Sequence, residues 1–199
     1  MFLSFSATAK ADRTTVRQAR FPQDYYYAAY LEYGLTPALT VGVDAGYGTN
    51  GDHTVLAFAR HPVLQGRAGA NVFALKAGAG TTRTGGQSQT LVMAGADWGR
   101  GFDTIFGDGW LSLETGLHYF TERGEVAAKA DLTAGVKAGD MKFMLQLQSG
   151  KYPGGDPYLR LVPSIAREVS AGQHVEVGLE AGLIGDDRIG VKVGAWLEF

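Results

Sequence analysis

The segment Lys192-Val193-Gly194-Ala195-Trp196-Leu197-Glu198-Phe199 alternates strictly between two kinds of side chain. One face of an extended chain would carry the apolar residues Val193, Ala195, Leu197 and Phe199. The other face would carry Lys192, Gly194, Trp196 and Glu198. Successive side chains of a strand point to opposite faces, so this pattern predicts a β-strand with one apolar face. Any half-buried edge strand also alternates, and the rest of the chain must therefore support a wider interpretation.

The same two-residue period recurs along the whole chain. Candidate strands follow one another at intervals of roughly 14–18 residues, separated by clusters of Gly, Asp, Asn, Pro and Thr. We count about twelve such strands, which predicts an all-β fold. Residues 110–121 and 128–138 alternate cleanly, but His53–Arg60 leaves open which face is apolar, and Leu91 and Met93 blur the pattern of 87–98. No linker is apparent, so residues 1–199 are expected to form a single domain.

Composition permits a membrane barrel. The chain has 199 residues with 29 Gly, 6 Pro and no Cys, a formal net charge of −2 and a mean hydropathy of −0.05. No apolar run approaches the length of a transmembrane helix, whereas barrel strands need only about 9–11 residues of alternating polarity. The near-neutral charge gives no reason to expect a nucleic-acid partner. Residues 1–6 contain too short an apolar run for a signal peptide, so any leader is expected to lie outside this sequence.

Two features favour an apolar face that points outward rather than into a soluble core. The polar face is rich in glycine, which weakens a solvent-facing strand but leaves room for long side chains inside a closed barrel. Aromatic residues also lie near strand ends on the apolar face, as in membrane-interface girdles (Tyr25, Tyr47, Trp98, Tyr119 and Phe199). A soluble sandwich with the same alternation remains the alternative.

The last eight residues resemble the terminal signal of bacterial outer-membrane β-barrels. That signal has a polar residue, a glycine, a hydrophobe and a final aromatic, and these places are filled by Lys192, Gly194, Leu197 and Phe199. The resemblance implies an integral protein of the Gram-negative outer membrane, folded as a closed antiparallel up-and-down transmembrane β-barrel. It also implies periplasmic termini and assembly into the lipid bilayer by the outer-membrane insertion machinery through the terminal strand.

This topology assigns each connection to one side of the membrane. The periplasmic connections would lie near residues 34–37, 61–71, 99–109, 138–140 and 168–173. The outer connections would lie near residues 12–24, 48–53, 80–87, 122–125, 150–156 and 185–188. None of the outer connections is long, so a large outer vestibule for a ligand is not expected.

The polar face would line the lumen of such a barrel. Its bases are Lys10, Lys76, Lys129, Lys137, Lys142, Arg160, Arg188 and Lys192, its acids are Glu32, Asp44, Asp97, Glu114, Asp131, Glu176, Glu180 and Glu198, and His118 lies among them. One interpretation is a channel or porin-like transporter for small polar solutes, with selectivity set by these charges. The other is a closed structural or partner-binding barrel, filled by paired charges.

A lipid-acting barrel enzyme is the third hypothesis. Glu114 and His118 share a strand face but lie about 13 Å apart along the strand, too far for direct contact. No Ser/His/Asn signature appears, and Gly78-Ala79-Gly80 opens no helix, so the dinucleotide motif fails. We therefore expect no enzymatic activity, no cofactor and no metal site.

Overall fold

The computed structural model describes residues 1–14, 24–65 and 71–199, and in these residues the chain forms twelve strands. Their bounds are β1 (Phe2–Asp12), β2 (Asp24–Thr36), β3 (Leu39–Gly48), β4 (His53–Gln65), β5 (Asn71–Thr84), β6 (Gln87–Thr104), β7 (Gly107–Phe120), β8 (Glu125–Ala138), β9 (Met141–Lys151), β10 (Tyr158–Ser170), β11 (Gln173–Ile184) and β12 (Arg188–Glu198). Parts of the predicted connections at 12–24 and 61–71 lie outside the described residues. Among the described residues, no helix has the length and hydropathy needed to cross a bilayer.

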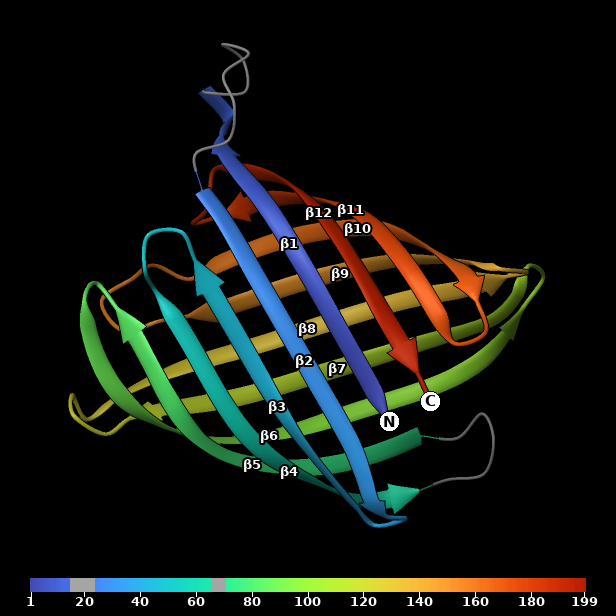
Figure 1. Cartoon of the computed structure of the whole chain (residues 1–199), viewed down its shortest axis with the longest axis horizontal. Helices are drawn as coiled ribbons and strands as arrows, with labels where there is room; N and C mark the ends of the chain where they lie inside the picture. Colours follow the sequence, from blue (N-terminus) through green and yellow to red (C-terminus); the bar gives the residue numbers. More distant parts are fainter. Residues whose placement is uncertain (15–23, 66–70) are drawn as a thin grey trace.

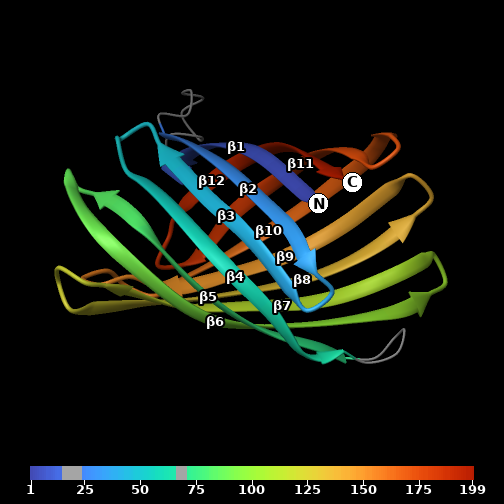
Figure 2. The ribbon, with the colours of Figure 1, turned by 60° about the horizontal axis from the view of Figure 1, so that its bottom comes forward.

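The strands form one closed barrel in which each strand pairs antiparallel with its neighbours in the sequence. The closing contact joins β1 to β12 over a continuous register from Phe2↔Glu198 to Asp12↔Arg188. Figures 1 and 2 show both termini together at one end of the barrel, where the Met1 amino group donates to the Phe199 carbonyl at 3.1 Å. We call this end the terminal rim and the opposite end the distal rim. The predicted all-β closed barrel is confirmed.

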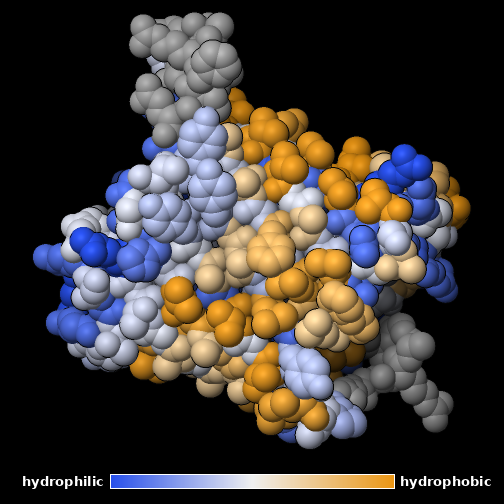
Figure 3. Space-filling model, viewed as in Figure 1, coloured by the Kyte–Doolittle hydropathy of each residue, from blue (hydrophilic) through white to orange (hydrophobic). Residues whose placement is uncertain are grey.

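The apolar face points outward along the wall. Large hydrophobic side chains are exposed on every strand, for example Phe5 on β1, Leu117 on β7 and Val177 on β11. Figure 3 shows hydrophobic residues across the middle of the wall and hydrophilic residues gathered at its ends. Exposed apolar surface on this scale is unfavourable in water and suits a hydrocarbon environment.

Several local predictions need correction. The predicted connections at 34–37 and 80–87 are mostly strand, because β2 continues to Thr36 and β5 continues to Thr84. The supposed connection at 99–109 is mostly strand, because β6 continues to Thr104 and β7 begins at Gly107, with Ile105 and Phe106 at the turn. Trp98 is not at a strand end but inside β6, opposite Phe73 of β5. Glycines 99 and 101 suggested a loop, but the backbone pairing Gly99↔Ser112 and Gly101↔Trp110 continues through them.

Inward glycines make room mainly for aromatic rings rather than for the charged chains that the sequence suggested. A methyl group on Gly42 or Gly78 would collide with Phe58, and one on Gly135 would collide with the ring of Trp110. Charged chains also lie over inward glycines: a methyl group on Gly95 would lie 2.8 Å from Cε of Lys76, and one on Gly190 would lie 3.3 Å from Cγ of Lys10. Glycine is therefore required where a bulky inward side chain lies directly over the backbone of a neighbouring strand.

Candidate functional site

The described residues enclose three interior cavities arranged along the barrel. The distal cavity has a volume of about 440 Å³, the central cavity about 120 Å³ and the terminal cavity about 710 Å³. The distal and central cavities share Asp44, Leu56, His118 and Lys129 in their walls, and the central and terminal cavities share Tyr30 and Glu114. The cavities thus follow one another from rim to rim, with the smallest in the middle.

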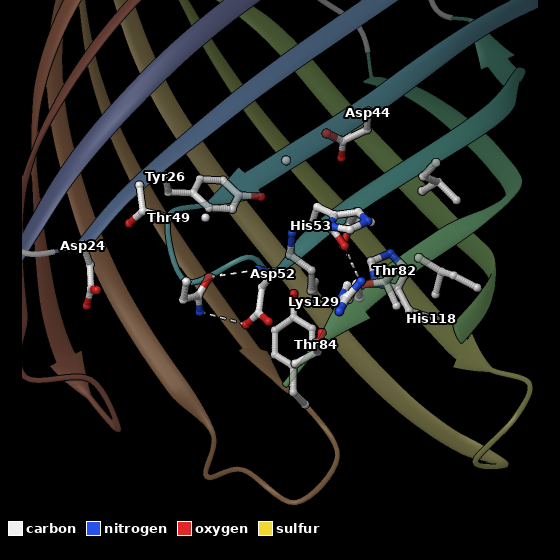
Figure 4. Close-up of a pocket in the computed structure, with 18 of the residues that line it drawn as sticks. Asp24, Tyr26, Asp44, Thr49, Asp52, His53, Thr82, Thr84, His118 and Lys129 are labelled. Atoms are coloured by element: carbon white, nitrogen blue, oxygen red, sulfur yellow. Dashed lines mark hydrogen bonds between the residues drawn. The ribbon is translucent and has the colours of Figure 1, made fainter. Parts of the chain in front are cut away.

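The distal cavity is lined largely by polar side chains, shown in Figure 4. Thr54 and Thr82 share a hydrogen bond of 2.8 Å, and Asn50 donates to Asp52 at 2.9 Å in the β3–β4 turn. Tyr26 faces inward over Gly46 and is nevertheless 45% exposed. The distal cavity is therefore open at its rim.

One network of ion pairs lies on the wall formed by β1, β10 and the β11–β12 hairpin. Glu180 lies 2.6 Å from Lys10 and 3.6 Å from Arg160, while Asp186 lies 2.6 Å from Arg160 and 2.9 Å from Arg188. Burial alone would raise the pKa of Asp186, but hydrogen bonds from Arg188 and the charge of Arg160 together hold that pKa below its usual range. Asp186 was not among the residues singled out in the sequence, because it lies in a turn rather than on a patterned strand.

A second network crosses β2 and β4–β7. Arg60 lies 2.6 Å from Glu32 and 3.7 Å from Asp97, and Lys76 lies 2.6 Å from Asp97 and 3.9 Å from Glu114. Four of these side chains are largely buried, but that of Glu114 is 53% exposed. Glu114 is in the middle of β7 and faces the interior, where it borders both the central and the terminal cavity.

Two isolated pairs lie near the terminal rim. Lys192 pairs with Glu176 at 3.0 Å, and Lys142 pairs with Glu198 at 3.1 Å while its ammonium group lies 5.3 Å from the ring centroid of Trp196. These four charged side chains and Trp196 all line the terminal cavity. Lys137, predicted to face inward, also lines this cavity and forms no ion pair with any other described residue.

Three inward charges around the central cavity stand apart from the networks. Asp44 on β3 and Lys129 and Asp131 on β8 all line that cavity. Within residues 1–14, 24–65 and 71–199, none of the three is engaged in an ion pair, and Asp131 Oδ1 is buried without a hydrogen-bond partner. None of these three charges is in a close ion pair with a side chain of the described wall, but Lys129 shares the small cavity with both carboxylates.

An apolar cluster inside the barrel was missed in the sequence. Leu56, Phe58, Leu91, Met93 and Phe120 are buried there, and Phe58 stacks on Tyr30 with ring centroids 5.6 Å apart. The sequence does mark this cluster, because the alternation of polar and apolar residues breaks down there. β4 carries apolar residues on both faces, and Leu91 and Met93 interrupt the polar face of β6. The interior is thus polar on some strands and apolar on others.

The histidines form no arrangement typical of catalysis. His118 lines the distal and central cavities, and His174 stacks on Trp196 at 4.9 Å. Among the described residues, no histidine ring bonds to a serine or threonine hydroxyl, and no group of three or more His, Cys, Asp or Glu is placed to hold a metal ion.

A closed twelve-stranded barrel with an apolar outer wall has the architecture of an integral bacterial outer-membrane protein. Comparison with solved structures agrees. The chain is similar to the KdgM porin, with 7% identity, a TM-score of 0.67 and coverage of 100% of this chain and 99% of that one. It is similar to the NanC porin at 9% identity, a TM-score of 0.60 and coverage of 99% and 100%.

The fold is shared with proteins of other activities. Outer membrane phospholipase A from Escherichia coli is similar at 12% identity, a TM-score of 0.55 and coverage of 99% of this chain and 96% of that one. No protein-family model and no curated protein sequence matches the chain. At these identities the likeness establishes the fold, and the function has to be argued from the interior.

Proposed function

We propose that this barrel is a passive outer-membrane channel for small polar solutes. The observation that carries the proposal is the exposure of Glu114, whose side chain is 53% accessible although it faces inward from the middle of β7. A filled barrel would shield that position from water. The similarity to the KdgM and NanC porins supports a channel, and one KdgM structure is a complex with disordered oligogalacturonate.

The central cavity is the smallest of the three, at about 120 Å³. The stacked rings of Tyr30 and Phe58 form part of its wall. We therefore expect small solutes to pass and a low conductance.

Selectivity in this proposal depends chiefly on Asp44, Lys129 and Asp131. Fixed charges select ions when they are not already neutralised by a neighbour. The remaining predicted lumen residues have a different role, since most of them are paired and hold the wall together (Glu32, Lys76, Asp97, Lys142, Arg160, Glu176, Glu180, Arg188 and Lys192). Glu114 and His118 line the path without a close ion pair.

Single-channel recording in planar bilayers tests the proposal. The wild-type barrel should give small, steady conductance steps, and Phe58→Ala should enlarge them by widening the central cavity. Lys129→Met should shift the reversal potential toward cation selectivity and Asp44→Asn toward anion selectivity, whereas Lys142→Met, in a pair near the rim, should change it less. Silence from both wild type and Phe58→Ala, with folding verified by gel mobility, would contradict a channel.

A closed structural or partner-binding barrel is the second candidate. The apolar cluster around Phe58 and Leu91 favours it, because such side chains fill interior volume and repel water. The same recordings distinguish the two, since a closed barrel remains silent whatever charge is neutralised. We propose no enzymatic role, because the likeness to the phospholipase concerns the fold alone.

Assembly is proposed to depend on the terminal strand. Lys192 and Gly194 lie on the inward face of β12, while Leu197 and Phe199 continue its outward face. Phe199 is 72% exposed at the rim and is available for contact with insertion machinery.

A further inference from the structure

The outer wall carries an apolar groove across β1–β4, on the side that Figures 1 and 3 present. Its volume is about 620 Å³. Ala29 and Ala45 form part of its floor, and Phe5, Tyr27, Tyr47 and Val55 are among the side chains that border it. All four bordering side chains are exposed, so they stand up from the wall on either side of the smaller residues.

The groove faces hydrocarbon once the barrel is in a membrane. Apolar surfaces gain little hydrophobic energy from each other there, and association depends on close van der Waals packing. A concave surface between rigid aromatic rings offers an acyl chain more contact than the convex wall elsewhere. The shape therefore suits a single chain, held against Ala29 and Ala45.

Two basic side chains lie where the groove reaches the distal rim. His53 lines the groove at the start of β4, and Arg83 of β5 is its direct partner in the register. Thr82 is buried and bonds inward to Thr54, so strand alternation directs Arg83 toward the outer face. Both His53 and Arg83 also border the mouth of the distal cavity, so they stand on the rim between the lumen and the outer wall. Arg83 is exposed and forms no ion pair with any other residue of the described chain.

We propose that this groove is a binding site for one phosphate-bearing lipid of the leaflet at the distal rim. The acyl chain lies between Phe5, Tyr27 and Tyr47, and the phosphate accepts hydrogen bonds from the Arg83 guanidinium and the His53 ring. Arginine matches a phosphate in two parallel hydrogen bonds, and cations beside a bilayer surface attract anionic headgroups. In the topology implied by periplasmic termini, this is the outer leaflet.

Native mass spectrometry of the purified full-length barrel, with lipid A added in detergent, tests the site. Wild type should retain one lipid A at concentrations where further adducts are lost. Arg83→Glu and Ala45→Phe should each weaken retention about tenfold or more, the first by removing a charged hydrogen bond and the second by filling the floor. Arg123→Glu is the matched control, because Arg123 is a cation of the same rim whose guanidinium bonds to Gln87 instead.

The results of this experiment distinguish a specific lipid from the other possible occupants of the groove. Equal weakening by Arg83→Glu and Arg123→Glu would show attraction by the rim as a whole and overturn the site, as would full retention by Ala45→Phe. A doubled protein mass with no retained lipid would assign the groove to a second copy of the chain. Ala29→Phe repeats the filling test if Ala45→Phe fails to show the gel mobility of a folded barrel.

Discussion

Lys76 offers a quantitative test of the interior network. Its ammonium lies 2.6 Å from Asp97, and the two side chains are 14% and 11% exposed. Removing one partner of a buried pair costs about 3–5 kcal/mol, because the other charge is left without compensation. Arg60 remains 3.7 Å from Asp97 after Lys76→Met, so we expect a loss near the lower end, about 3 kcal/mol.

Two variants make that value interpretable. Lys142→Met breaks a pair whose carboxylate, Glu198, is 51% exposed, and such pairs contribute about 0–1 kcal/mol. The double variant Lys76→Met with Asp97→Leu should lose less than Lys76→Met alone, since no buried charge is stranded.

The assay is urea unfolding of the barrel in lipid vesicles, followed by the fluorescence of its three tryptophans. If Lys76→Met costs no more than Lys142→Met, the network does not stabilise the wall. A double variant as unstable as Lys76→Met would show that the loss comes from packing over Gly95 rather than from a stranded charge.

Three further predictions concern other parts of the barrel. Asp186 has a lowered pKa in the folded state, so its stabilising effect is complete above its unfolded pKa of about 3.9 and is lost as the pH falls below that value. Between pH 6 and pH 2, the free energy of unfolding of Asp186→Asn should therefore decrease less than that of the wild type. Identical pH dependence of the two proteins would contradict the lowered pKa. Leu113→Arg, on the outward face of the middle of β7, should destabilise the barrel in vesicles by about 2–4 kcal/mol, and a loss well below 1 kcal/mol would place that face away from lipid. Deleting Phe199 should reduce assembly in vivo, read from heat-modifiable gel mobility, far more than deleting Met1, and equal yields would remove the proposed role of the terminal aromatic.

The barrel was predictable because its determinants are local. Alternation in β7, β8 and β12 fixes which side chains share a face, and strand spacing fixes the number of crossings. Alternation alone also fits a soluble sandwich, so the membrane barrel was favoured by the glycine-rich polar face, by the aromatics near strand ends and by the resemblance of Lys192 to Phe199 to a terminal signal.

The partners inside the barrel were not predictable, because they depend on closure and register. Lys10 meets Glu180 only because β1 pairs with β12 and so approaches β11. Phe58 and Met93 point inward on strands whose outer faces are also apolar, so alternation gives no signal there. The sequence placed the glycines beside Phe58 and Trp110 on the inner face, but it could not show which aromatic ring lies over each glycine.

The proposed channel requires an interior that water can reach at the middle of the membrane. The chain has no cysteine, so single thiols can be introduced at neighbouring positions by Glu114→Cys and Leu113→Cys. A water-soluble, charged thiosulfonate reagent added during bilayer recording should modify the thiol at position 114 and reduce the current, and it should leave the Leu113→Cys channel unchanged. Modification at position 113, or no change in current at position 114, would contradict a water-filled channel.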